Sequence, residues 1–197
     1  MNAAIVRPSL FRGLLSALIV LVLQTTALCR PAGPDATYDR YLVSIGRQAE
    51  TLATRLDRTR DRLDASIQRQ VERGTSDAKL IRTINTSASS LSKQIQSSAN
   101  ALIKSATASK RSLERMVVAA ERRGDDDAAS EASDLAEVIQ GHIDTCRSET
   151  ASILSKIEQY RAEVTGSDDV GEAYVDAAEE LSSDFDAFYS ALEEAFE

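Results

Sequence analysis

The stretch LVSIGRQAETLATRLDRTRDRLDASIQRQV, residues 42–71, decides the fold. Its apolar residues recur at intervals of three, four or seven: Leu42, Ile45, Ala49, Leu52, Leu56, Leu63, Ile67 and Val71. This is the spacing of one packed face of an α-helix. Oppositely charged residues three or four positions apart, such as Arg60 and Asp64, indicate ion pairs on the exposed face of that helix. The stretch therefore predicts a long helix over residues 38–73 that ends before Gly74.

The same apolar spacing returns three more times along the chain. It predicts helices over residues 76–122, 126–164 and 168–196, and no proline interrupts the chain after Pro34. Glycines and helix-starting Ser or Asp residues separate the four segments, which leaves only short connections between them. Helices joined by short connections pack antiparallel. We therefore expect an all-α fold, an elongated antiparallel up-down helical bundle or coiled coil of about four long helices, forming a single domain over residues 38–197.

The charge of the chain reverses sign at Gly124. Residues 38–123 carry 17 basic and 9 acidic residues, a net charge of +8, whereas residues 124–197 carry 3 basic and 21 acidic residues, a net charge of −18. The reversal falls at the turn between the second and third helices. It predicts a basic hairpin that lies against an acidic hairpin, with an excess of acidic surface left over for a partner.

The N-terminal residues have the composition of a secretory signal peptide. Arg7 and Arg12 precede an apolar run over residues 14–23, and Ala27-Leu28-Cys29 has the small residues of a cleavage site. A run of ten residues is too short to span a bilayer, for which about 20 are needed. We therefore expect a cleaved signal peptide over residues 1–29, a short leader over residues 30–37, an extracellular location and no stable membrane anchor.

The chain has two cysteines, and their pairing depends on where the signal peptide is cut. Cleavage after Cys29 leaves Cys146 as the only cysteine of the secreted chain, whereas earlier cleavage leaves both. In an oxidising compartment, Cys146 is then a buried free thiol, half of a disulfide between two chains, or the partner of Cys29. All three alternatives remain open from the sequence.

His142 and Cys146 lie four residues apart on the core face of the third predicted helix. A His/Cys pair at this spacing can offer two ligands to zinc, but the chain has no second histidine to complete a site. The alternative is a polar layer in the helix seam beside a small buried thiol. We favour the second interpretation and expect no metal and no cofactor.

Asn85-Thr86-Ser87 matches the acceptor sequence for N-glycosylation. The match has meaning because a signal peptide precedes it, and Asn85 lies beside the core position Ile84. We expect modification of Asn85 if this flank of the helix stays open to solvent.

The inventory of reactive residues indicates that the chain is not an enzyme. It holds one histidine, no tryptophan and no glycine-rich phosphate loop, and its many carboxylates occupy outer helix positions. Carboxylates on a solvated face keep ordinary pKa values and contribute little to acid–base catalysis. Removal of residues 1–29 leaves 21 basic and 31 acidic residues, and this excess of negative charge argues against nucleic acid as a partner.

Two functions fit these observations. The first is a secreted non-enzymatic helical bundle that acts as an interaction or structural element, through a protein partner or through self-association. The second is a lipid carrier, because a proline-poor chain of amphipathic helices resembles the general plan of the exchangeable apolipoproteins, such as the insect apolipophorin III type. That resemblance implies reversible lipid binding by the helices. The apolar stripes of this chain are narrower than the broad apolar faces that bind lipid surfaces, so we favour the first function.

Overall fold

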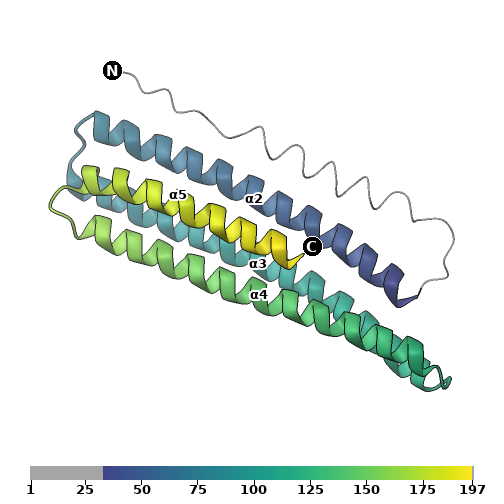
Figure 1. The fold of residues 1–197 in the computed structure, drawn as a ribbon. Coiled ribbons are helices and arrows are strands. Elements are labelled where there is room, and N and C mark those ends of the chain that lie inside the picture. Colours follow the sequence, from purple (N-terminus) through teal and green to yellow (C-terminus); the bar gives the residue numbers. More distant parts are fainter. Residues whose placement is uncertain (1–32, 197) are drawn as a thin grey trace.

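The protein is described by a computed structural model, in which residues 33–196 form four long helices. They are α2, Pro34–Glu72; α3, Asp77–Glu121; α4, Asp126–Thr165; and α5, Val170–Ala195. Consecutive helices run in opposite directions and pack along their lengths (Figure 1). The predicted all-α antiparallel bundle of four helices is thus confirmed for this part of the chain. The predicted signal peptide, Cys29 and residues 30–32 of the leader lie outside the described residues.

The turns between the helices follow the predicted signals. Gly74 and Gly124 adopt positive φ angles of 61° and 70°, a conformation that glycine adopts at little cost. Asp125 and Asp169 precede α4 and α5, and their side chains accept hydrogen bonds from the backbone N–H groups of Ala128 and Glu172. These bonds satisfy donors that have no partner inside the helix.

The start of the first helix corrects one prediction. The leader was expected to extend to residue 37, but α2 already begins at Pro34. Proline is well tolerated in the first turn of a helix, where its missing N–H group would have no partner in any case. Residues 34–37 therefore belong to the bundle, and the Thr37 hydroxyl lies 3.7 Å from Sδ of Met116 on α3.

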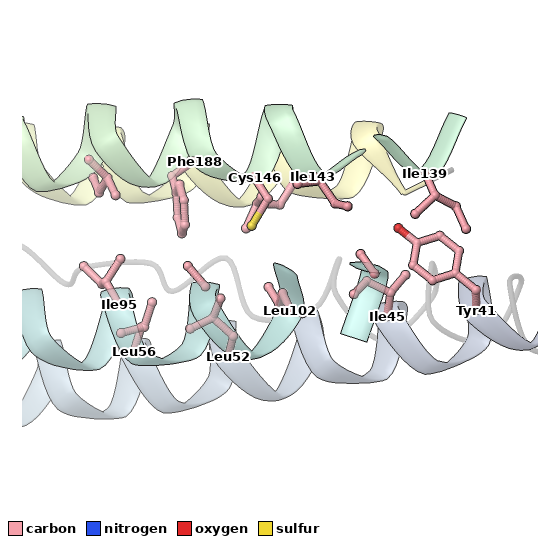
Figure 2. Packing of buried hydrophobic residues seen from close by; sticks show 14 of the residues in the cluster. Tyr41, Ile45, Leu52, Leu56, Ile95, Leu102, Ile139, Ile143, Cys146 and Phe188 are labelled. Atoms are coloured by element: carbon pink, nitrogen blue, oxygen red, sulfur yellow. The ribbon is translucent and has the colours of Figure 1, made fainter. Parts of the chain in front are cut away.

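The helices bury two apolar clusters between them. The larger one contains residues from all four helices. Figure 2 shows part of it: Ile45, Leu52 and Leu102 of the first hairpin, α2 and α3, face Ile143, Cys146 and Phe188 of the second hairpin, α4 and α5. The smaller cluster consists of Ile67, Leu80, Ile84, Val164 and Val170 and lies at the end of the bundle that contains the α2–α3 and α4–α5 turns. None of the helices in residues 33–196 is long and apolar enough to cross a membrane.

The basic hairpin, α2 and α3, was expected to pair its charges with those of the acidic hairpin, α4 and α5, but the ion pairs of the described residues lie elsewhere. Of the ion pairs between described residues, Arg60–Asp57, Lys110–Glu114, Arg147–Asp144 and Arg161–Glu158 each lie within one helix, and Lys156–Asp184 joins α4 to α5. The hairpins are instead linked by hydrogen bonds in which at least one partner is uncharged, such as Lys110 Nζ to Gln140 Oε1 at 2.9 Å. The hairpins pack through apolar side chains, and the charge reversal mainly divides the outer surface.

Candidate functional site

A cavity separates the two apolar clusters inside the bundle. Its volume is about 70 Å³, it is partly open to solvent, and all four helices contribute to its walls. Ile157 and Leu91 bound it on the side of the larger cluster, and Ile67, Ile84 and Val164 bound it on the side of the smaller one. The cavity is thus an interruption in an otherwise continuous apolar interior.

The wall of the cavity is polar where α2 faces α5. The Tyr174 hydroxyl of α5 donates a hydrogen bond of 2.5 Å to Oδ1 of Asp64 on α2. Burial raises the pKa of Asp64, although this hydrogen bond and the nearby Arg60 act in the opposite direction. Burial also raises the pKa of Tyr174, and the Asp64 carboxylate raises it further. The pair ties the first helix of the bundle to the last.

Arg60 is one of two cationic groups of the cavity wall, the other being Arg161 of α4, which pairs with Glu158. Its guanidinium lies over the ring of Phe185, with Cζ 5.9 Å from the ring centroid, and its Nη2 is 4.0 Å from Oδ1 of Asp57. Its Nη1 is buried and has no hydrogen-bond partner among the described residues. A buried N–H donor without an acceptor is costly, by about 1–3 kcal/mol or more for a charged group.

The sequence did not predict this arrangement. Arg60 and Asp64 were interpreted as an exposed ion pair, but both side chains are half-buried, and Asp64 bonds to Tyr174 on another helix. The heptad pattern identifies which side of a helix faces the bundle centre. It does not identify which flanking side chains are covered by the neighbouring helix. Tyr174 lies four positions from both Val170 and Ala178, and a polar ring at this apolar spacing was the one available signal.

A second polar group joins α4 to α5 next to the cavity. Asp184 accepts hydrogen bonds from the Lys156 ammonium and from the Tyr160 hydroxyl, the latter at 2.7 Å. Burial acts to raise the pKa of Asp184, but these two donors outweigh it and leave that pKa lowered. The same hydrogen bond raises the pKa of Tyr160 to about 12. Asp184 is thus an ionised anchor between the two acidic helices.

His142 lies in an aromatic group at the C-terminal end of α5. Its Nδ1 is 2.9 Å from the Tyr41 hydroxyl, and its ring centroid is 5.7 Å from that of Tyr41 and 5.6 Å from that of Phe196. The group brings together α2, α4 and the residue that follows α5. Burial lowers the pKa of His142, because the charged imidazolium is less well solvated there than in water.

Stability should therefore fall as the pH drops below about 6.5, the value for His142 in the unfolded chain. A lowered pKa means that the unfolded chain binds the proton first, so the stability present above this pH is lost on acidification. We expect the urea midpoint to fall between pH 7 and pH 5, and the His142→Gln variant to lack this fall. Asp64, whose pKa is raised in the folded state, contributes with the opposite sign and cannot cause it. An equal fall in the variant would contradict this assignment.

Cys146 is a buried thiol in the larger cluster, 2 % exposed, and is unbridged in the described part of the chain. Burial raises the pKa of its thiol, although a hydrogen bond with Thr150 and the charge of Arg147 act in the opposite direction. Figure 2 shows its sulfur pointing into the apolar interior. A disulfide with a second chain would require this thiol to leave the core. No three His, Cys, Asp or Glu side chains among residues 33–196 are grouped to hold a metal ion.

Asn85 lies in the interior of α3 and is half-buried. Within its acceptor sequence, Thr86 is exposed and Ser87 is buried beside the cavity. Part of the Asn85 side chain thus reaches solvent, and its glycosylation stays a prediction.

The outer surface of α5 is acidic along its whole length. The helix contains no lysine or arginine. Its exposed carboxylates are Glu172, Asp176, Glu179, Glu180, Asp186, Glu193 and Glu194. Opposite these residues, Phe185, Phe188 and Leu192 are buried, so the helix has one apolar side and one acidic side.

Comparison with known proteins identifies no relative. No family model matches the chain, and neither the curated proteins nor the solved structures contain a match.

Proposed function

We propose that this chain is a secreted, non-enzymatic helical-bundle protein that holds a basic protein partner on the outer surface of α5. The observation that carries the proposal is the composition of that helix, whose exposed side is acidic and without a single cation. Such a surface attracts and orients a partner rich in Lys and Arg, and the attraction weakens with salt.

The positions of the reactive side chains support a binding role over a catalytic one. His142 is hydrogen-bonded to Tyr41 within the aromatic group, and Cys146 is enclosed in the larger cluster. Asp64 and Asp184 are held by donors from neighbouring helices. These four groups are engaged in contacts within the bundle, and the exposed glutamates of α5 remain for recognition.

The test uses a 20-residue peptide of alternating Lys and Ala as a probe at 150 mM salt. One variant replaces four exposed acids of α5 by glutamine: Glu172, Glu179, Glu180 and Glu193. A matched variant replaces four exposed acids of α2 and α3 by their amides: Asp39, Glu50, Glu72 and Glu121. Both variants gain the same net charge, so they differ only in the surface that is changed.

We expect the α5 variant to bind the peptide at least tenfold more weakly than the native chain and the matched variant to bind within about threefold of it. Fluorescence anisotropy measures both affinities. Equal losses in the two variants would show a general effect of net charge and would contradict a binding surface on α5.

A further inference from the structure

We propose that the cavity between the two apolar clusters binds a medium-chain carboxylic acid, with the end of its alkyl chain inside the bundle and its carboxylate on Arg60. This site is separate from the acidic surface of α5 and does not depend on the proposed function. The proposed ligand is an amphiphile with one anionic head group.

The walls of the cavity suit an alkyl chain. Most of its lining side chains are Leu, Ile, Val or Ala, contributed by all four helices. Its volume of about 70 Å³ is roughly half that of an engineered apolar cavity of about 150 Å³ that binds benzene. The end of an alkyl chain therefore fits inside the closed bundle. The rest of the chain would lie toward the partly open side of the cavity, with its carboxylate at Arg60.

The head group is determined by the polar atoms of that wall. Asp64 already accepts a hydrogen bond from Tyr174, whereas Nη1 of Arg60 is buried and without an acceptor. The Asp57 carboxylate is 4.0 Å from Nη2, which is beyond hydrogen-bond distance. A carboxylate from outside that accepts from the guanidinium of Arg60, which lines the cavity, forms a charge-assisted hydrogen bond. The wall carries two cations, Arg60 and Arg161, against one carboxylate, Asp64, and therefore favours an anionic head group over a cationic one.

Arg60 is also well placed to face both the cavity and solvent. Its side chain is 21 % exposed, and it packs on Phe185 at the junction of α2 and α5. A ligand bound there can keep its head group near the surface while its alkyl chain is buried, which is the arrangement that an amphiphile prefers.

Isothermal titration of the full-length protein, with hexanoate, octanoate and decanoate below their micelle concentrations, tests the site. We expect saturable binding to one site, with affinity that rises by up to about fourfold for each methylene buried. Octanol, which has the same chain without the charge, should bind at least tenfold more weakly than octanoate. Absence of saturable binding for all three acids would overturn the proposal.

Three variants locate the site. Arg60→Gln should weaken octanoate at least tenfold and leave octanol unchanged, whereas Arg58→Gln, on the exposed side of the same helix, should change neither. Ala178→Leu places a larger side chain into the cavity wall and should weaken both ligands. Far-UV circular dichroism checks that each variant is folded. Equal weakening of acid and alcohol by Arg60→Gln, or native affinity in folded Ala178→Leu, would overturn the proposal. If Ala178→Leu does not fold, the binding of octanoate and octanol to Arg60→Gln decides whether the proposal holds.

Discussion

Replacement of Phe185 by alanine is expected to lower the free energy of unfolding by about 3–5 kcal/mol. The ring of Phe185 is 1 % exposed, belongs to the larger apolar cluster and supports the guanidinium of Arg60. Its removal leaves a void under the Arg60 guanidinium, and the surrounding helices can move inward only partly to fill it. Urea denaturation followed by circular dichroism measures the effect.

The control for this variant is Val175→Ala on the same helix. Val175 is 47 % exposed, so its truncation should change the free energy of unfolding by no more than about 0.5 kcal/mol. A loss below 1 kcal/mol for Phe185→Ala would contradict the packing of α5 against the other three helices.

Replacement of Leu113 by alanine should cost about 2–5 kcal/mol. Phe196, at the end of α5, contacts His142 of α4. Lys110 of α3 forms a hydrogen bond with Gln140, which precedes His142 on α4, so Leu113 lies in the part of the bundle that extends beyond the end of α5. Its side chain is nevertheless fully buried, at 0 % exposure. The prediction therefore tests whether α2, α3 and α4 form a packed core without the fourth helix.

Val118→Ala supplies the comparison on α3. This side chain is 45 % exposed and should contribute no more than about 0.5 kcal/mol. If Leu113→Ala has an effect as small as that of Val118→Ala in urea denaturation, this end of the bundle is not closed as described.

The sequence was sufficient to predict the helices because apolar spacing and turn residues agree. The core stripe of α2 contained Ile45, Leu52 and Leu56, and each of them is buried. Gly74 and Gly124 stand where the chain reverses, and both need the conformation that favours glycine. The start of α2 was placed too late, because proline and glycine in the leader indicate a loop as readily as the first turn of a helix.

The candidate sites were less predictable because they depend on how neighbouring helices meet. Cys146 was correctly placed in the interior by its phase, whereas His142 is half-buried and Ile143 takes the buried position beside it. The contact of His142 with Tyr41 joins residues 101 positions apart. The cavity has no local signal at all, since it results from the fit of four side-chain surfaces. Asp64 was assigned to solvent by its spacing from Arg60, and only the approach of α5 covers it.

The four helices close within one chain, and the contacts of the aromatic group at His142 test this closure most directly. Nuclear Overhauser effects between the ring protons of His142 and those of Tyr41 and Phe196 report ring centroids 5.7 and 5.6 Å apart. The chain has a single histidine, so its signals can be assigned without ambiguity. We predict these effects in a uniformly ¹³C-labelled sample and their absence in an isotope-filtered spectrum of a mixture of labelled and unlabelled chains. Their appearance in the filtered spectrum would show that helices of two chains complete the bundle and would contradict closure within one chain.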